Sequence, residues 1–280
     1  MSNIKANQSI LVLGGTGKTG SRIVERLTKT NHRVRVGSRS AQPGFNWEDS
    51  STWGAALQDI TAVYIAFHPD LAIPGTTAII RDFVAAAIAH KVQRLVLLSG
   101  RGEEEARQCE QIVMDSGLDW TIIRASWFCQ NFSEGAFLEP ILAGHVALPA
   151  GDTGEPFVDA DDIADIAVVA LTEDGHSGRL YEVTGTRLLT FKEAIAEIAG
   201  ATGREIAYEY VPVEAYAAML QEYQLPEQMI WLITYLFTEV LDGRNAVLTD
   251  GVQQALGRQP TAFSEYVRKT ALTGVWNMPG

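Results

Sequence analysis

The sequence has few cysteines, no basic runs and no long apolar stretch. Its two cysteines, Cys109 and Cys129, lack the spacing of a metal motif, no other metal-ligand spacing occurs, and such sparse cysteine is typical of a reducing compartment. The net charge is −12 without any Lys/Arg cluster, whereas nucleic-acid binding requires a basic face. The stretch 230–241 is too short to span a bilayer, and the N-terminal residues are not a signal peptide. We therefore expect a cytoplasmic protein with no metal, nucleic-acid or membrane partner.

Short apolar runs alternate with segments of helical periodicity over most of the chain. Residues 80–88, for example, place Ile80, Phe83, Val84, Ala87 and Ile88 on one helical face. Strands that alternate with helices of this length form parallel sheets, so the pattern predicts an α/β fold. The predicted strands are Ser9–Leu13, Arg33–Gly37, Ala62–Phe67, Arg94–Ser99, Trp120–Arg124 and Leu180–Thr184.

The pattern changes after Thr184. Thr190 and Glu193 have the spacing of a helix capping box, a strand-like segment follows at Glu205–Val211, and the sequence is then helical to about residue 241. We predict two domains: a nucleotide-binding domain over residues 1–185, in which residues 125–157 contribute to the substrate pocket, and a smaller, mainly helical lobe over residues 186–280.

A glycine-rich loop follows the first predicted strand directly. Residues 14–20 read GGTGKTG and precede a helical segment, which is the arrangement in which a loop and a helix N-terminus bind the pyrophosphate of a dinucleotide. A triphosphate-binding P-loop is excluded, because it would require glycine at the position of Val12.

The end of the second predicted strand indicates which dinucleotide is bound. NAD-binding proteins usually place an acidic residue there to bind the ribose hydroxyl groups, but this strand ends in Ser38, Arg39 and Ser40. Arg39 can pair with a 2′-phosphate, and the serine hydroxyls can donate hydrogen bonds to it. We therefore predict that the cofactor is NADP(H).

Five segments resemble the NmrA-like family of atypical short-chain dehydrogenases/reductases, in particular its quinone-reductase-like and ergot-alkaloid-reductase-like branch. They read LVLGGTGKTGSRIVERL, RLVLLSG, SGLDWTIIRASWFCQNF, FVDADDIADIAVVAL and YEVTGTRLLTFKEAIAEIAGATGREIAY, and they cover almost the whole chain in family order. The resemblance implies a Rossmann-type, doubly wound parallel sheet that binds NADP(H), with a pocket closed by the C-terminal lobe.

The resemblance also assigns roles to individual positions. It places Ala66, Phe67 and His68 beside the adenosine ribose and the pyrophosphate, Ser99 and Gly100 near the nicotinamide ribose, and Asn131 at the start of the substrate wall. Together with the residues of the glycine-rich loop and of the second strand, these positions make up the predicted cofactor-binding set. It consists of Gly14, Thr16, Gly17, Lys18, Thr19, Ser38, Arg39, Ala66, Phe67, His68, Ser99, Gly100, Trp127 and Phe128.

Aromatic residues after residue 125 and in the C-terminal lobe are candidates for the substrate pocket. The predicted substrate-pocket residues are Asn131, Phe132, Trp231 and Tyr235. Ordinary core packing is the alternative and explains at least half of the aromatic residues in these regions. A pocket lined by them would favour a flat, hydrophobic substrate.

The usual catalytic signature of short-chain reductases is missing. Ser99 occupies the position of their serine, but residues 100–118 contain neither the tyrosine nor the lysine of Tyr-x-x-x-Lys, so the catalytic residues are unknown. Two hypotheses remain. The protein is an NADPH-dependent reductase whose small hydrophobic substrate, a quinone, iminium or enone-like compound, needs little acid assistance. Alternatively, it binds NADP(H) without turnover and reports redox state to a protein partner.

Acidic residues at two predicted helix starts have an ordinary explanation. Glu103, Glu104 and Glu105 complement a helix dipole, and Asp162 is interpreted as a helix cap or packing anchor.

Overall fold

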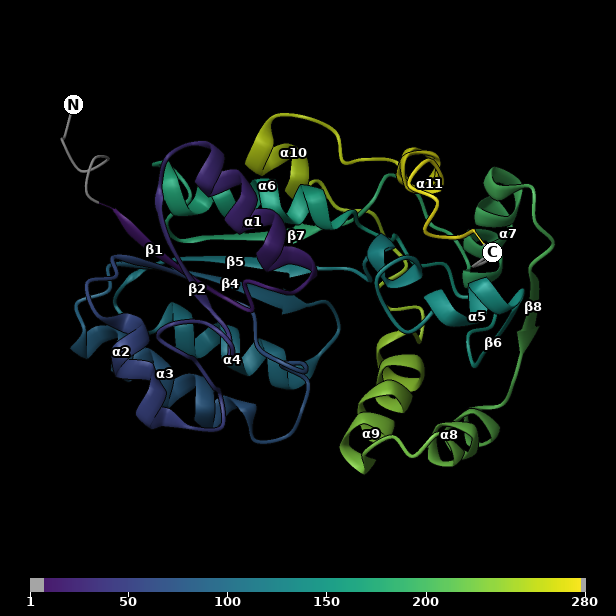
Figure 1. The fold of residues 1–280 in the computed structure, drawn as a ribbon, viewed down its shortest axis with the longest axis horizontal. Helices are drawn as coiled ribbons and strands as arrows, with labels where there is room; N and C mark the ends of the chain where they lie inside the picture. The colour runs from purple at the N-terminus through teal and green to yellow at the C-terminus, as the bar shows by residue number, and fades with distance from the viewer. Residues whose placement is uncertain (1–7, 278–280) are drawn as a thin grey trace. The chain divides into compact units, whose positions relative to one another are not determined.

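A computed structural model describes residues 8–277, and the chain forms two compact units (Figure 1). Unit 1 consists of the chain up to Ala125 together with Asp161–Val183 and Gly251–Arg258, and unit 2 consists of Ser126–Ala160, Thr184–Asp250 and the chain from Gln259. The predicted division at residue 185 differs from these units in two segments. Residues 126–160, predicted in the first domain, belong to unit 2, and residues 251–258, predicted in the second, belong to unit 1.

Unit 1 is built on a six-stranded sheet in which all neighbouring strands are parallel. Its order is β2-β1-β3-β4-β5-β7, which confirms the predicted Rossmann-type α/β fold. Each strand was predicted from the sequence to within two residues at either end. The strands are β1 (Ser9–Leu13), β2 (Arg33–Gly37), β3 (Ala62–Ile65), β4 (Arg94–Gly100), β5 (Asp119–Ala125) and β7 (Arg179–Val183).

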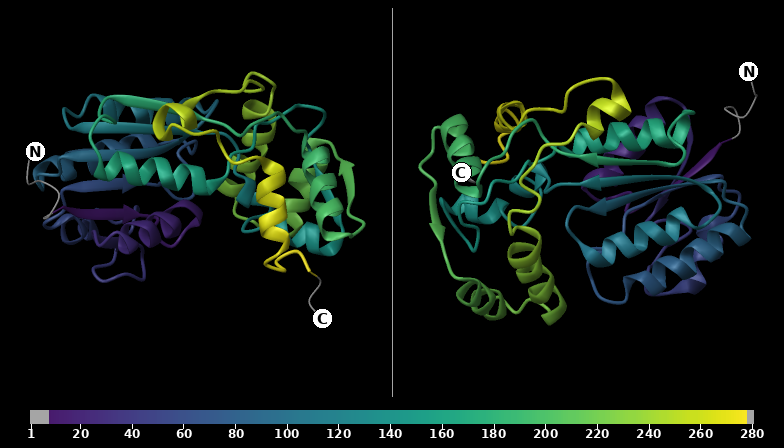
Figure 2. Two further views of the ribbon diagram at one scale, coloured as in Figure 1. Left: turned by 90° about the horizontal axis from the view of Figure 1, so that it is seen from above. Right: turned by 180° about the vertical axis from the view of Figure 1, so that it is seen from behind.

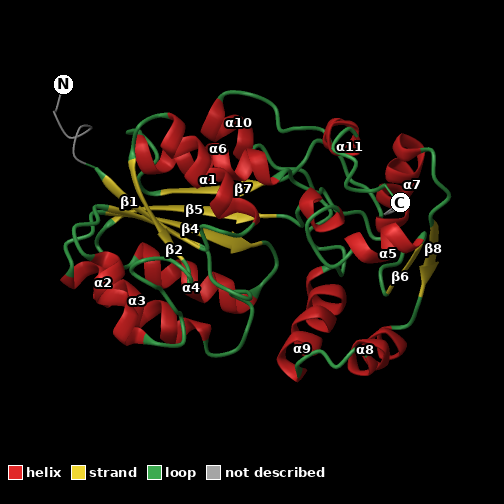
Figure 3. Cartoon of the chain, in the orientation of Figure 1, coloured by secondary structure: helices red, strands yellow, loops and turns green. Residues whose placement is uncertain are grey.

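Helices cover both faces of this sheet (Figures 1 and 3). Residues 10–13 of β1 are fully buried, as expected for a strand packed on both sides, and this is why its sequence is a continuous apolar run. One face carries α1 (Lys18–Lys29), α6 (Ala160–Thr172) and α10 (Gly251–Leu256), and the other carries α2 (Trp53–Leu57), α3 (Thr76–Ala89) and α4 (Glu104–Met114). A short 3-10 turn, Ser50–Thr52, precedes α2.

The strand order fixes where a ligand can bind on unit 1. The chain passes from β1 to β2 on one side, and then to β3 on the other side of β1. In open parallel sheets such a reversal leaves a crevice at the carboxyl ends of the two strands. The loops after β1, β2 and β3 therefore border the expected ligand site.

Unit 2 is mainly helical and contains a two-stranded parallel sheet of β6 (His145–Leu148) and β8 (Ala207–Tyr210). The segment predicted as a strand at Glu205–Val211 contains β8, whereas β6 was not predicted. The capping box of Thr190 and Glu193 opens α7 as expected. The other elements are a 3-10 turn at Cys129–Phe132, α5 (Leu138–Ala143), α7 (Phe191–Thr202), α8 (Val213–Glu222), α9 (Glu227–Tyr235), a π-helical turn at Leu236–Val240 and α11 (Phe263–Ala271).

The core of unit 2 is aromatic. The rings of Phe132, Phe157, Phe191 and Phe263 are buried and pack edge to face or tilted, with centroid distances of 5.1–6.0 Å. Figure 2 shows the helices of this unit from two further directions. No helix within residues 8–277 has the length and apolar character needed to cross a bilayer.

Candidate functional site

The glycine-rich loop lies at the carboxyl end of β1, where the strand order reverses. Gly14 has a φ of +65°, which favours glycine, and its amide donates to the Gly37 carbonyl oxygen at 3.0 Å. A Cβ atom on Gly20 would lie 2.1 Å from the Gly14 carbonyl oxygen. The loop and α1 therefore approach each other at a distance that only glycine permits.

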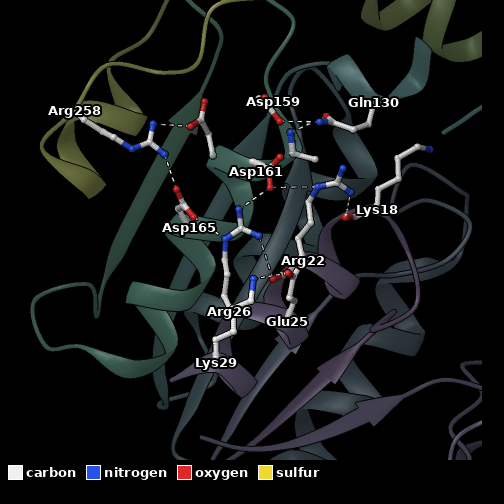
Figure 4. A network of polar contacts seen from close by, with 12 residues as sticks. Lys18, Arg22, Glu25, Arg26, Lys29, Gln130, Asp159, Asp161, Asp165 and Arg258 are labelled. Carbon is white, nitrogen blue, oxygen red and sulfur yellow. Dashed lines mark hydrogen bonds and ion pairs between the residues drawn. The ribbon is translucent and has the colours of Figure 1, made fainter. Parts of the chain in front are cut away.

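The start of α1 has the character of an anion site. Its N-cap residue is Gly17, which has no side chain to cap the helix, and its first turn contains no acidic residue. The amide groups of a first turn carry a partial positive charge, which favours a phosphate. Lys18 adds a full charge, and Figure 4 shows its side chain directed away from the neighbouring arginine–aspartate network.

Thr19 contributes to this site differently from Thr16. Thr16 is exposed, whereas the Thr19 side chain is buried and its hydroxyl accepts a hydrogen bond from the Tyr64 hydroxyl at 2.9 Å. Burial also raises the pKa of Tyr64, which therefore remains a neutral donor. The Thr19 hydroxyl thus joins α1 to β3, and any contact of Thr19 with a phosphate would come from its backbone.

An ion-pair network holds α1 against α6 and α10 (Figure 4). Arg26 contacts Asp161 at 2.6 Å and Asp165 at 2.7 Å, and Arg258, which follows α10, contacts Asp165 at 2.6 Å. Arg258 also pairs at 2.6 Å with Asp162, a fully buried residue, in agreement with the packing role expected for that aspartate. This network fixes the helix that presents the phosphate loop.

A cavity of about 470 Å³ lies beside the loop and the edge strand β2. Its lining residues are Thr16, Val34, Arg35, Val36, Ser38, Ser40, Ala41 and Gln42, and none of them is acidic. The hydroxyl groups of Ser38 and Ser40 lie 3.3 Å apart, and the exposed Arg39 stands between these two residues in the sequence. Arg35 donates to the carbonyl oxygens of Ala56 and Gln58 at 2.8 and 2.7 Å. It therefore serves mainly to hold the C-terminal end of α2.

These features fit an NADP(H) molecule. The glycine contacts allow the backbone to come close to a pyrophosphate, and the uncapped start of α1 attracts its charge. The cavity offers hydroxyl donors, and Arg39 has no hydrogen-bond partner among residues 8–277, so its guanidinium is available to a phosphate.

The residues after β3 have different surroundings. Phe67 packs on Trp47 with a centroid distance of 5.0 Å and belongs to the edge of the hydrophobic core. Ala66 is half-buried, and its Cβ atom lies 3.3 Å from the position that a Cβ on Gly14 would occupy. His68 is exposed. Ala66 thus borders the glycine-rich loop.

The Ser99 hydroxyl is engaged within unit 1. It donates to Glu110 Oε1 at 2.6 Å, and the same oxygen accepts from Arg124 Nε at 2.9 Å. Arg124 also pairs with Glu182, which in turn pairs with the buried Arg101. Ser99 is therefore part of a polar network at the carboxyl end of β4 and does not present a free hydroxyl.

A pair of carboxyl groups at the same end of the sheet was not anticipated from the sequence. Glu103 was expected to complement a helix dipole, but its buried side chain lies over Gly100 and hydrogen-bonds to the carboxyl group of Asp70. Burial raises the pKa of both carboxyl groups, and the neighbouring charge of Glu110 raises that of Glu103 further. The raised pKa of both groups favours a proton on this pair, because two carboxyl groups can share a hydrogen bond only when one of them is protonated.

Gly100 is required by this arrangement. A Cβ atom at this position would lie 2.0 Å from Glu103 Oε1, so the carboxyl group occupies the space of a missing side chain. The only signal of this in the sequence is a glycine three residues before a glutamate, which is too common a pattern to predict a contact.

The predicted residues after β5 lie in unit 2. The half-buried Trp127 packs against Phe191 and Phe237 with centroid distances of 5.3 and 5.2 Å. Phe132 is fully buried and its carbonyl oxygen accepts from the Trp276 indole at 2.8 Å, which favours a packing role. Phe128, predicted to bind the cofactor, and Asn131, predicted to line the substrate pocket, are both half-buried.

Trp231 and Tyr235 lie one turn apart on α9. Their rings stack with centroids 5.2 Å apart and an angle of 10° between planes, and Trp231 is 40% exposed. The structure thus brings these two candidate residues together on a surface of unit 2.

The remaining candidates for reactive or metal-binding side chains are the two cysteines and the acidic and histidine residues. Both cysteines are buried, and burial raises the pKa of the Cys109 thiol to about 12, which keeps it from being a nucleophile. The described part of the chain has no group of three His, Cys, Asp or Glu side chains arranged to hold a metal ion.

Three features meet at the carboxyl ends of the strands: the reversal of strand order, the glycine-rich loop and the uncapped start of α1. Together they define a dinucleotide-binding protein. Comparison with known families and proteins agrees with this. A family model described as NAD(P)H-binding matches residues 14–174, which is more than half of the chain. The chain belongs to this NAD(P)H-binding family, which confirms the resemblance found in the sequence motifs.

Relatives match over nearly the whole chain. Prestalk A differentiation protein A of Dictyostelium discoideum is 28% identical, over 94% of this chain and 92% of its own. Festuclavine synthase II of Penicillium roqueforti is 30% identical, over 92% of this chain and 96% of its own. An NADPH-dependent quinone oxidoreductase of Escherichia coli, solved with NADPH, shares the fold with a TM-score of 0.78 and 21% identity, over 93% of this chain and 99% of its own.

Proposed function

We propose that the chain is an NADPH-dependent oxidoreductase that transfers hydride to a small hydrophobic electrophile, such as a quinone, an iminium or an enone-like compound. The observation that carries the proposal is the cavity beside the phosphate loop. It is lined by Ser38 and Ser40, the two residues that flank Arg39 in the sequence, and it contains no acidic side chain. Family membership supports binding of NAD(P)H, and the full-length similarity to festuclavine synthase II favours an enzyme that uses it.

The preference for NADPH over NADH follows from charge. A 2′-phosphate in the cavity would accept hydrogen bonds from Ser38 and Ser40 and pair with the Arg39 guanidinium. An acidic residue at this strand end would repel it, and the sequence between Arg33 and Gly44 contains none. The other cofactor contacts proposed for Gly14, Thr16, Gly17 and Lys18 use the loop backbone and the start of α1 and do not depend on the 2′-phosphate.

When bound, NADPH supplies a hydride from its nicotinamide ring. The chain contributes little conventional acid catalysis, since residues 100–118 contain no tyrosine or lysine and the Ser99 hydroxyl donates to Glu110. Its role would be to orient the two reactants, which is sufficient for an electrophile that is already electron-poor. On the substrate side we propose contacts from Asn131, Trp231 and Tyr235, which are exposed or half-buried. Phe132 is a weaker candidate, because its side chain is fully buried.

A substrate panel tests the proposal. Purified protein would be mixed with NADPH and with single quinones, enones and imines, and NADPH oxidation would be followed by its absorbance. Transfer of deuterium from the nicotinamide of labelled NADPH to the product, detected by mass spectrometry, would establish direct hydride transfer. With an enone or an imine, NADPH oxidation that leaves no deuterium on a product carbon would contradict the proposal. With a quinone the new hydrogens of the hydroquinone are on oxygen and exchange with solvent, so the readout there is one hydroquinone formed for each NADPH oxidised. No NADPH oxidation across the panel would also contradict the proposal.

One observation favours a second candidate, a non-catalytic NADP(H) sensor that acts through a protein partner. The Ser99 hydroxyl, which would assist a carbonyl substrate, is committed to Glu110 and Arg124. A sensor would capture its partner in amounts that differ between NADPH and NADP⁺, and it would show no turnover. Equal capture with both nucleotides would argue against this candidate.

A further inference from the structure

The start of α4 contacts the loop between β3 and α3 through two carboxyl groups. Glu105 Oε1 accepts hydrogen bonds from the backbone amides of Gly75 and Thr77, where α3 begins, at 3.1 and 3.3 Å. Glu103 hydrogen-bonds to the carboxyl group of Asp70, near the middle of the loop. The start of α4 thus holds at two points a loop that borders the expected ligand site of unit 1.

The contact made by Glu105 suits a charged carboxylate. The N-cap residue of α3 is Gly75, which has no side chain to cap the helix, so the Glu105 carboxylate takes the place of a capping side chain. A negative charge is favourable there, because the amide groups of the first helical turn carry a partial positive charge. This contact therefore does not depend on a proton.

The contact between Glu103 and Asp70 does depend on a proton. Neither residue pairs with a Lys, Arg or His among residues 8–277, and the other charge that acts on Glu103 is the carboxylate of Glu110, which pairs with Arg124. Burial raises the pKa of both Asp70 and Glu103. Without a shared proton the two carboxylates would repel each other, in surroundings that screen charge poorly.

Glu103 has little room to move away from Asp70. It is 7% exposed, and its Oε1 atom lies 2.0 Å from the position that a Cβ on Gly100 would occupy, at the end of β4. Asp70 is half-buried and belongs to the loop, where its Oδ1 atom also accepts from the amide of Ala72 at 2.8 Å. Repulsion between the two carboxylates would therefore shift Asp70 together with the loop that carries it.

Asp70 divides this loop into two parts. Leu71 and Ile73, which follow it, are buried and anchor the second part. The first part begins at Ala66, whose Cβ atom lies 3.3 Å from the position that a Cβ on Gly14 would occupy in the glycine-rich loop. A shift at Asp70 is therefore passed to the part of the loop that adjoins the glycine-rich loop.

We propose that Asp70 and Glu103 are positioning residues for dinucleotide binding, and that the proton they share holds the first part of the loop after β3 in the arrangement that the nucleotide binds. Binding of the nucleotide and binding of this proton are then linked. The affinity is complete at low pH and falls as the pH rises through the range in which the pair loses its proton. The inference needs a bound dinucleotide but no turnover, so it applies to a reductase and to a sensor alike.

A pH series of nucleotide titrations tests the inference. The fluorescence of the reduced nicotinamide would report binding of NADPH and of NADH at constant ionic strength. Between about pH 6 and about pH 9 the Kd of the wild-type protein should rise at least about threefold, and by no more than about tenfold per pH unit, because one proton is involved. The same rise with NADH, which has no 2′-phosphate, would exclude titration of the ligand as the cause.

Two substitutions of Glu103 should act in opposite directions. In Glu103→Gln the side-chain amide can donate to the Asp70 carboxylate at any pH, so this variant should keep the low-pH affinity of the wild type over the whole range. Glu103→Ala removes the contact and should bind at every pH about as weakly as the wild type does at the highest pH. Glu104→Gln changes an exposed neighbour and should follow the wild type.

Proton uptake gives an independent measurement. Calorimetry of NADPH binding in two buffers with different ionisation enthalpies should show that the wild type takes up a fraction of a proton in the pH range where its affinity falls. Glu103→Gln should take up less. His68 is exposed on the same loop, and it is present in both proteins together with the 2′-phosphate of the ligand, so their contributions cancel in the difference.

The outcomes separate this inference from the proposed function. A wild-type Kd that does not change with pH, or a Glu103→Gln variant with the same pH dependence as the wild type, would overturn the positioning role while nucleotide binding stands. If the pH dependence and its loss in Glu103→Gln are found but the substrate panel shows no NADPH oxidation, the reductase fails and this inference stands. Failure of the protein to bind any nucleotide would overturn both.

Discussion

Arg39 is the residue on which the choice of nucleotide depends. It follows Ser38, which lines the cavity, and its guanidinium is exposed without a hydrogen-bond partner among residues 8–277. Arg39→Ala should weaken NADPH by about 1.5–3 kcal/mol, the range for a hydrogen bond to a charged group, and leave NADH nearly unchanged. Calorimetric titration of both nucleotides measures the difference.

Arg33→Ala is the matched control, because Arg33 is an exposed arginine at the other end of the same strand. It should leave both affinities unchanged. If Arg39→Ala weakens NADPH and NADH equally, Arg39 does not contact the 2′-phosphate.

The carboxyl pair of Asp70 and Glu103 predicts a dependence of stability on pH. Burial raises the pKa of both groups in the folded state, so folding favours the protonated form. Their contribution to stability is fully present below the ordinary carboxyl pKa of about 4, and it is lost as the pH rises through the raised folded value. The pair therefore destabilises the protein as the pH rises above the ordinary carboxyl range.

Glu103→Gln should remove most of this dependence, because a glutamine can hydrogen-bond to Asp70 without titrating. Between about pH 5 and pH 8 the free energy of unfolding of the variant should therefore fall less than that of the wild type, so the variant becomes the more stable of the two as the pH rises. Urea denaturation at several pH values measures this. Glu104→Gln, which changes an exposed neighbour, should follow the wild type, and a Glu103→Gln curve parallel to the wild type would refute the protonated pair.

Residues that act through the backbone were easier to predict than residues that act through a side-chain partner. Gly14 and Gly20 are set by a local loop, so the sequence pattern is sufficient to place them. The partners of Ser99 and Glu103 are Glu110 and Asp70, which come from other segments. No local pattern specifies such pairs. The sequence therefore predicted only a Ser99 near the nicotinamide ribose and a Glu103 that complements a helix dipole.

At the scale of elements, the contact between the start of α1 and the glycine-rich loop leaves no space for a side chain at Gly20. A Cβ on Gly20 would lie 2.1 Å from the Gly14 carbonyl oxygen. The position of the Cβ is fixed by the backbone of α1 and the oxygen belongs to the backbone of the loop, so a side-chain rotation cannot relieve this contact. Gly20→Ala should destabilise the fold by about 1–3 kcal/mol through overpacking and weaken both NADPH and NADH, because it displaces the start of α1. Chemical denaturation and nucleotide titration check the two effects.

Gly200 offers a matched control for this substitution. It lies within α7, and a Cβ there would meet no atom within 4 Å. Gly200→Ala should stabilise the protein by about 0.5–1 kcal/mol through helix propensity. A Gly20→Ala variant as stable as the wild type would show that α1 is not held at this distance.

Strands and helices followed the predictions where their pattern was local. Strands β1, β3 and β4 contain continuous buried apolar runs, and the capping box at Thr190 marks the start of α7. Strand β6 was missed, since His145–Leu148 has only four residues and is specified by its pairing with β8, about sixty residues later in the chain. The π-helical turn at Leu236–Val240 likewise has no distinct sequence signal.

At the scale of the whole molecule, the chain leaves unit 1 and returns to it twice. Residues 161–183 and 251–258 complete the nucleotide-binding unit after excursions into unit 2. The sequence could not predict the second return, because α10 is only six residues long and is fixed by tertiary contacts such as the ion pair of Arg258 with Asp162.

The central claim, that the loop after β1 and the end of β2 bind NADP(H), is tested most directly by calorimetric titration of the wild-type protein with NADPH, NADP⁺, NADH and NAD⁺ at one salt concentration. The predicted result is that both phosphorylated nucleotides bind, and that each binds more tightly than its unphosphorylated counterpart by at least about tenfold. Equal affinity with and without the 2′-phosphate would contradict the role of Ser38, Arg39 and Ser40. Failure of all four nucleotides to bind would contradict the account as a whole.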